Sequence, residues 1–100
     1  MLPLMYKVEL KFDDRVLSQS DIEKLYEETD EIFAKEDLSR EDGWANKRVY
    51  LDRGRKQDYG RFWAAIFALK NSTKISKYLQ ECFWYNGKEK ENLITDFIRG

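Results

Sequence analysis

Hydrophobic and polar residues alternate at two places along the chain. Residues 4–12 place Leu4, Tyr6, Val8, Leu10 and Phe12 between Met5, Lys7, Glu9 and Lys11. Residues 47–52 repeat the pattern, with Val49 and Leu51 on one side and Arg48 and Tyr50 on the other, and Gly54 ends the run. A period of two predicts a half-buried β-strand at each place. The pattern leaves open whether the two strands run parallel or antiparallel.

A helical period follows the first strand, over residues 21–37. Ser20 and Glu23 have the spacing of a capping box, which marks the start of a helix. One face of this segment is apolar, through Ile22, Leu25, Tyr26, Ile32 and Phe33. The opposite face is acidic and carries Glu23, Glu27, Asp30 and Glu31. The segment is therefore predicted to be an amphipathic helix with an acidic outer surface.

Three further helices are predicted in the second half of the chain. Residues 62–69 are apolar nearly all round, which is typical of a helix buried at the centre of a domain. The stripe of Ile75, Tyr78, Leu79, Cys82 and Phe83 has helical spacing, and Asn86-Gly87 suits a left-handed helix end. Leu93, Ile94, Phe97 and Ile98 mark a last helix. Between the first helix and the second strand, residues 39–46 are expected to form a loop whose Trp44 packs back onto the core.

The element order predicts one small α+β domain covering residues 1–100: β-α-β, then three helices. Two strands alone make a marginal sheet, so a third short strand, or a sheet edge shared with a second subunit in a dimer, stays open. The predicted core consists of Val8, Leu10, Ile22, Leu25, Ile32, Phe62, Ile66, Leu79 and Phe97.

Composition supports a globular domain outside the membrane. Hydrophobic residues make up 42% of the 100 residues, and no apolar run is long enough to span a bilayer. The first twelve residues do not read as a signal peptide, because they lack a basic start and alternate in polarity. The single cysteine excludes an internal disulfide. We therefore expect a protein of the reducing cytoplasm.

The net charge of −1 hides a division between the two halves of the sequence. Residues 1–46 hold 6 Lys+Arg and 13 Asp+Glu, a balance of −7, whereas residues 47–100 hold 12 and 6, a balance of +6. Such asymmetry indicates an acidic or a basic interaction surface. The alternative is that the halves fold together and neutralise each other.

Few residues in this chain could carry catalysis. There is no histidine, which removes the commonest general base and metal ligand. Cys82 lies in an apolar stripe and is expected to be a buried structural thiol, since a reactive thiol needs an accessible, electropositive setting. We expect no metal, no cofactor and no enzymatic activity.

One fragment nevertheless resembles part of a metal-dependent nuclease. Glu9 and Lys11 lie on the same side of the first strand, where a carboxylate could hold magnesium and a lysine could support the attacking water. Such a site needs a second carboxylate, and Asp52 could supply it only if the two strands are suitable neighbours. Polar alternation on an exposed strand explains the same residues, so a nuclease ranks third among the functions considered.

Nucleic-acid binding ranks second and depends on the basic segment 47–77. This segment contains nine lysines and arginines but only two carboxylates, Asp52 and Asp58. The cations nearest the second strand are Lys47, Arg48, Arg53, Arg55, Lys56 and Arg61. Lysine and arginine can contact phosphates, and Tyr50 or Tyr59 could stack on a base. The pI of about 5.5 and the lack of RNA-binding signatures argue against this function. Phe62 and Trp63 suit the core better than a stacking surface.

The favoured hypothesis is a non-enzymatic domain that binds another protein. The acidic helix face, with Glu23, Glu27, Asp30 and Glu31, suits a cationic partner, because charge steers encounter and aromatic residues anchor the complex. Inhibitors, immunity proteins and virus-encoded antagonists act in this general way, which is an analogy of physical type only.

Overall fold

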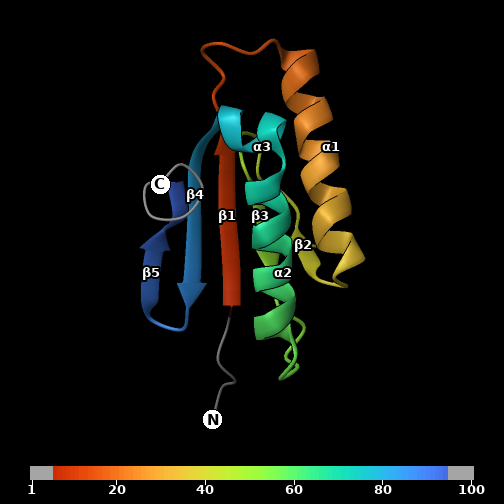
Figure 1. Ribbon diagram of the computed structural model, residues 1–100, viewed down its shortest axis with the longest axis vertical. Coiled ribbons are helices and arrows are strands. Elements are labelled where there is room, and N and C mark those ends of the chain that lie inside the picture. The colour runs from red at the N-terminus through yellow and green to blue at the C-terminus, as the bar shows by residue number, and fades with distance from the viewer. Residues whose placement is uncertain (1–5, 95–100) are drawn as a thin grey trace.

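The computed structural model describes residues 6–94. These residues form one twisted sheet with helices packed on one of its faces (Figure 1). Along the chain the elements are β1 (Tyr6–Phe12), α1 (Gln19–Lys35), β2 (Ser39–Glu41), β3 (Arg48–Leu51), α2 (Asp58–Asn71), α3 (Thr73–Tyr78), β4 (Leu79–Asn86) and β5 (Glu89–Asn92). The α+β class predicted from the sequence is confirmed.

The sheet has five strands in the order β2-β3-β1-β4-β5, and every neighbouring pair is antiparallel. The strand direction that the pattern left open is thereby settled: β1 and β3 pair antiparallel, with Leu10 opposite Arg48. The connection through α1 leads from β1 to β2 and leaves β3 between them. The connection through α2 and α3 leads from β3 to β4 and leaves β1 between them. This is the split β-α-β arrangement, followed here by an added hairpin strand.

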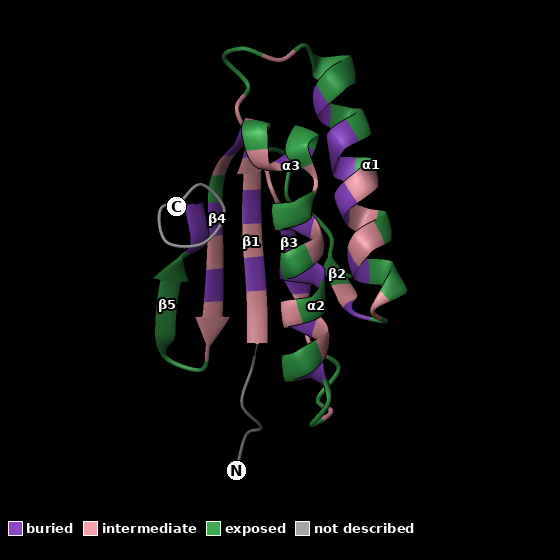
Figure 2. Ribbon diagram, in the orientation of Figure 1, coloured by how far each residue is buried: buried purple, intermediate pink, exposed green. Residues whose placement is uncertain are grey.

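Alternation along β1 separates the core from the open side of the sheet. Val8, Leu10 and Phe12 are buried and the residues between them only partly buried, which gives the alternating bands along β1 in Figure 2. Lys7 and Glu9 therefore lie on the face opposite to the core. The core joins both long helices to the sheet. The rings of Phe33 on α1 and Tyr50 on β3, for example, stack with centroids 3.9 Å apart.

Most of the predicted core is confirmed. Val8, Leu10, Ile22, Leu25, Phe62, Ile66 and Leu79 are all buried. Ile32 is only partly buried and packs against the core from its side. Phe97, and with it most of the predicted last helix, lies outside the described residues, which end at Ile94.

The predicted helix over residues 75–83 is wrong in its second half. The helix α3 ends at Tyr78, and β4 begins at Leu79. Lys11 pairs with Glu81 but Phe12 pairs with Leu79, so the register shifts by one residue at this point. The extra residue brings Leu79 to the same buried face as Cys82 and Trp84. A bulge thus produced a spacing of three that imitates a helix.

The number of strands was also underestimated. Asn86-Gly87 does not end a helix; it starts the turn between β4 and β5, where Asn86 pairs with Glu89. Gly87 has φ of 61°, which glycine adopts readily as the first central residue of a two-residue hairpin loop. The short β2, inside the predicted loop, adds the other edge of the sheet.

Three local predictions require correction. The N-cap of α1 is Ser18 and not the predicted Ser20. The Ser18 hydroxyl accepts a hydrogen bond of 3.1 Å from the amide of Asp21. Helix α2 is not buried all round: Tyr59 is 47% and Phe67 50% exposed, because its outer face has no layer above it among the described elements. Trp44 is 45% exposed and donates to Glu41 in place of packing on the core.

Candidate functional site

Three of the four predicted acidic residues form a line on the outer face of α1. Glu23, Glu27 and Glu31 are exposed and follow one another at intervals of four residues, so they stack along the helix. Glu23 accepts one long hydrogen bond of 3.4 Å from Gln19. Within residues 6–94, Glu27 and Glu31 take part in none of the ion pairs. We call Glu23, Glu27 and Glu31 the acidic ridge.

The fourth residue, Asp30, faces the other way and belongs to the framework. Its Oδ1 accepts hydrogen bonds from the Tyr50 hydroxyl at 2.6 Å and from Arg48 Nε at 3.2 Å, and its Oδ2 accepts one from Arg40 at 2.7 Å. Burial, followed by the bond to Asp30, raises the pKa of Tyr50 strongly. Asp30 therefore joins α1 to β2 and β3 and is not part of the acidic ridge.

The cations of the basic segment do not form one continuous exposed stripe. Lys47 pairs with Glu9 at 3.0 Å on the open side of the sheet, and Arg48 pairs with Asp30 on the helix side. Arg53 and Arg55 lie near Asp37, at 3.8 Å and 2.7 Å, and Arg61 reaches the Glu36 carbonyl at 3.3 Å. Lys56 is exposed and takes part in none of the ion pairs within the described range.

The loop that carries most of these cations is folded around Asp58. This carboxylate is fully buried at the first turn of α2 and accepts hydrogen bonds from the Arg53 amide at 2.7 Å and from Arg55 Nε at 2.8 Å. Burial disfavours its ionised form, but these hydrogen bonds outweigh burial and lower the pKa of Asp58. Sequence reasoning missed this role, although a carboxylate at a helix N-terminus is a known start signal.

Ion pairs across the two halves of the chain account for much of the charge division. Five pairs join a carboxylate before residue 47 to a cation after residue 46: Glu9–Lys47, Asp30–Arg48, Asp37–Arg53, Asp37–Arg55 and Glu28–Lys74. The halves therefore neutralise each other in part. The acidic ridge is left outside this neutralisation.

The open face of the sheet is the side without helices, with Glu9 near its centre. Glu9 accepts hydrogen bonds from the Tyr85 hydroxyl at 2.7 Å and from Lys47 at 3.0 Å. Burial acts against ionisation of Glu9, but these two bonds outweigh it and lower the pKa. Ammonium groups also cover aromatic rings on this face, with Lys7 4.4 Å from the Tyr85 centroid and Lys90 4.2 Å from that of Phe83.

The residues proposed for a nuclease do not come together. Glu9 and Lys11 share the open face, but Asp52 lies beyond β3 beside Tyr6, to whose carbonyl its amide donates. Tyr6 lies in the helix-covered layer, so Asp52 and Glu9 belong to opposite faces. Across residues 6–94, no three histidine, cysteine or carboxylate side chains are grouped so that they could hold a metal ion.

Cys82 is buried as the sequence indicated. Its side chain has no solvent exposure, and burial raises the pKa of the thiol to about 12. A thiol in this setting stays protonated at neutral pH and is a poor nucleophile.

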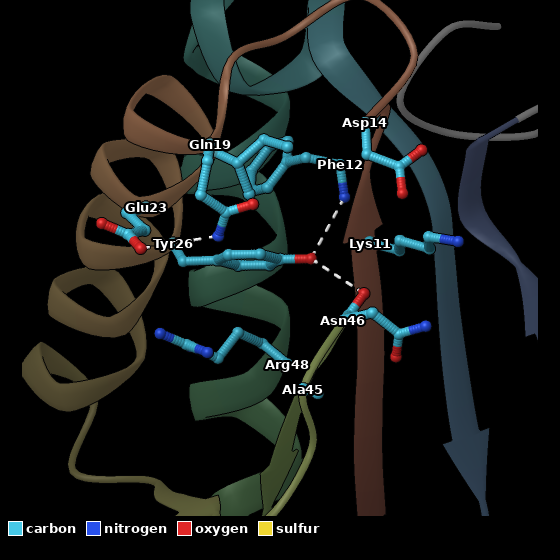
Figure 3. A pocket seen from close by; sticks show the side chains of 10 residues that line it. Lys11, Phe12, Asp14, Gln19, Glu23, Tyr26, Ala45, Asn46 and Arg48 are labelled. Carbon is cyan, nitrogen blue, oxygen red and sulfur yellow. Dashed lines mark hydrogen bonds between the residues drawn. The ribbon is translucent and has the colours of Figure 1, made fainter.

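A cavity of about 240 Å³ opens between the end of β1, the first half of α1 and the residues before β3 (Figure 3). The phenol of Tyr26 lies at its base and bridges the Phe12 amide, at 3.4 Å, and the Asn46 carbonyl, at 3.3 Å. Both the acidic ridge and the cavity include Glu23. No sequence signal pointed to this cavity, because it forms where strands β1 and β3 stop pairing.

Comparisons with models of protein families, with curated proteins and with solved structures found no match to this chain. Within the described range, no helix has the length and apolar character needed to cross a bilayer.

Proposed function

We propose that this chain is a non-enzymatic domain that binds a basic partner protein through the acidic ridge of α1. One observation carries the proposal: Glu27 and Glu31 make no ion pair within residues 6–94, whereas most cations of the basic segment are paired with carboxylates of the same chain. Within the described range, three exposed carboxylates that take part in none of the ion pairs, Glu23, Glu27 and Glu31, thus lie in one line on a helix face.

The ridge carries a cost for the isolated domain. Like charges four residues apart destabilise a helix by about 0.2–0.5 kcal/mol for each pair. Glu23, Glu27 and Glu31 make two such pairs in succession. A partner that places lysine or arginine against the ridge relieves this repulsion and is steered to it by the field. Inhibitors and antagonists of basic proteins in the cytoplasm work by this physical principle.

The test is affinity capture with the domain as bait in cells that express it, read by quantitative mass spectrometry. We expect one or a few basic proteins to be enriched on the wild-type domain and lost with Glu27→Lys/Glu31→Lys. The matched control is Arg53→Glu/Lys56→Glu, which reverses two exposed cations and should retain the partner. Arg55 is unsuitable as a control, because its reversal would leave the buried Asp58 without its cation. Retention of every enriched protein by Glu27→Lys/Glu31→Lys would contradict the proposal.

A second candidate function, binding of single-stranded nucleic acid, is favoured by one feature of the open face. Lys7 and Lys90 lie over the Tyr85 ring and Lys47 over the Trp44 ring, at 4.4, 5.5 and 4.0 Å from the centroids. Rings bordered by cations suit stacking on bases together with phosphate contacts. Glu9 at the centre of the face opposes phosphate, which makes this the weaker candidate.

A further inference from the structure

Strand β2 forms an open edge of the sheet. It stands first in the order β2-β3-β1-β4-β5 and pairs with β3 alone among the described strands. Figure 1 shows it at the border of the sheet, beside α1. A strand with one neighbour leaves every second N–H and C=O group pointing outward, where another chain can bind them. The cation on β2, Arg40, is already bound by Asp30 at 2.7 Å and by Asp42 at 3.0 Å.

A mostly apolar pocket of about 180 Å³ lies beside this edge, between α1 and strands β2 and β3. Four of its six lining residues contribute apolar surface: Phe33, Ala34, Leu38 and Tyr50. The other two, Asp30 and Arg40, pair with each other. Because neither charge in the lining is unpaired, the pocket suits an aliphatic side chain.

The strand register places this pocket next to any strand added at β2. Arg40 and Tyr50 are opposite each other in the β2–β3 register, and both line the pocket. Paired residues of neighbouring strands turn their side chains to the same face of a sheet. The residue of an added strand opposite Arg40 would therefore point to the α1 side, at the pocket. In peptide recognition of this kind, main-chain hydrogen bonds supply affinity and such pockets supply specificity.

The acidic ridge borders the same pocket. Asp30 and Ala34, in the pocket lining, follow Glu27 and Glu31 by three residues each, and residues three apart are neighbours on a helix. In an extended segment, residues two apart point to the same face. Cations two residues before and after an aliphatic residue would thus lie on the α1 side, near the carboxylates of the ridge.

We propose that the open edge of β2 and this pocket bind an extended segment of the basic partner, which pairs with β2 and places one aliphatic side chain in the pocket. The inference rests on the proposed function and names its mode of recognition. The cations of the segment lie against Glu27 and Glu31, so the edge and the acidic ridge form one continuous binding surface.

The test uses a synthetic peptide, because the partner need not be known. The ¹⁵N-labelled full chain is titrated with the capped peptide Arg-Thr-Leu-Thr-Arg and followed by ¹H–¹⁵N correlation spectra. We expect saturable shifts of the Ala34, Ser39, Arg40 and Glu41 amides. Two comparison peptides replace both arginines, or the leucine, by aspartate. Each should bind at least about tenfold more weakly, because the first repels the ridge and the second puts a charge in an apolar pocket.

Methylated peptides test the pairing of main chains. Successive N–H groups of a strand point to opposite edges. Of two peptides methylated at the nitrogen of the leucine or of the threonine that follows it, only one should therefore lose binding. Retention or loss of binding by both would contradict pairing with β2.

A variant of the chain tests the pocket. Ala34→Leu fills the pocket from an exposed position on α1 and should weaken binding of Arg-Thr-Leu-Thr-Arg about tenfold or more. The matched control is Ala64→Leu, at an exposed position on α2 outside the pocket, which should stay within about twofold of the wild type. The dispersion of the same spectra verifies that both variants are folded. Unchanged binding in Ala34→Leu, equal binding of the aspartate peptides, or dimerisation of the free chain through β2 would each overturn the edge site.

Failure of the edge site and failure of the proposed function are distinguishable. If Glu27→Lys/Glu31→Lys loses the captured protein but Ala34→Leu retains it and the peptide does not bind, the edge site is wrong and the proposed function stands. If Glu27→Lys/Glu31→Lys retains every captured protein while the peptide binds at β2, the proposed function is wrong.

Discussion

The hydroxyl of Tyr50 donates a hydrogen bond of 2.6 Å to Oδ1 of Asp30 and lies 2.9 Å from the hydroxyl of Thr29. Tyr50 is on β3, and Asp30 and Thr29 are neighbours on α1. Because Arg40 and Arg48 pair with the same carboxylate, one residue of α1 is tied to two strands at once. This group fixes how α1 lies on the sheet and therefore which of its carboxylates face outward.

Removal of the Tyr50 hydroxyl should destabilise the domain. In Tyr50→Phe, Thr29 and Asp30 lose a partner in a buried setting, and the free energy of unfolding should fall by about 1–3 kcal/mol. Urea denaturation at neutral pH measures the loss. The control is Tyr59→Phe, whose side chain is largely exposed and should change stability by less than about 0.5 kcal/mol. Equal stability of the two variants would show that the Asp30 group does not hold α1.

The packing of α2 on the sheet should depend on Phe62 and Ile66. Both side chains are fully buried, so Phe62→Ala or Ile66→Ala should lower the free energy of unfolding by about 2–5 kcal/mol. Phe67→Ala, on the half-exposed side of the same helix, should have a smaller effect. A loss under about 1 kcal/mol for either core variant in denaturant melts would mean that the central helix is misplaced.

Asp58 should make the stability of the domain depend on pH. Its pKa in the folded chain lies below the ordinary value of 3.8, so the unfolded chain binds this proton more tightly. The stabilisation is therefore complete above the ordinary pKa and is lost as the pH falls below it. When unfolding is measured from about pH 6 to about pH 3, the range in which carboxylates usually titrate, the free energy of unfolding should decline less in Asp58→Asn than in the wild type. Glu31→Gln, which alters an exposed carboxylate without an ion pair in the described range, should follow the wild-type curve. A decline in Asp58→Asn that parallels the wild type would contradict the assignment.

We predict no metal-dependent hydrolysis of nucleic acids. Glu9 is engaged by Lys47 and Tyr85, and Asp52 lies on the other side of the sheet. Incubation with single- and double-stranded nucleic acids in magnesium or manganese, followed by electrophoresis, should show intact substrates. Cleavage that disappears in Glu9→Gln would overturn this prediction.

Salt dependence separates the two candidate functions. If single-stranded nucleic acid binds the open face, each lost phosphate contact in Lys7→Gln or Lys90→Gln should reduce the magnitude of the log K against log salt slope by about 0.7. Fluorescence anisotropy with labelled oligonucleotides measures the slope, and Lys56→Gln, outside this face, serves as the control. If the acidic ridge alone carries binding, oligonucleotides should not bind at physiological salt. Tight binding that Lys7→Gln and Lys90→Gln weaken would make nucleic acid the favoured partner.

The sequence by itself determined the parts of this protein that depend on local periodicity. Alternation identified β1 and β3, and the helical stripes identified α1 and the buried face of α2. In β1 the apolar side faces the helices, whereas in β3 Val49 and Leu51 lie opposite Glu9 and Lys7 on the open face and Tyr50 packs against α1. The burial of Cys82 and the acidic character of the outer face of α1 followed from the same patterns. None of these inferences required knowledge of which elements are neighbours.

Only the tertiary structure decided features that join distant segments. The bulge opposite Lys11 and Phe12 shifted the phase of β4, so that a strand carried the spacing of a helix. Asp30 and Glu27 look alike in the sequence, but the approach of β2 and β3 places Arg40 and Arg48 beside Asp30, while Glu27 has no ion pair within residues 6–94. The cavity at Tyr26 exists because β1 and β3 separate after Leu10 and Arg48, at a point set by strand register. Ion pairs and the end of a strand ladder are relations between segments that are far apart in the sequence. The pattern of residues along the chain does not give the distances between those segments.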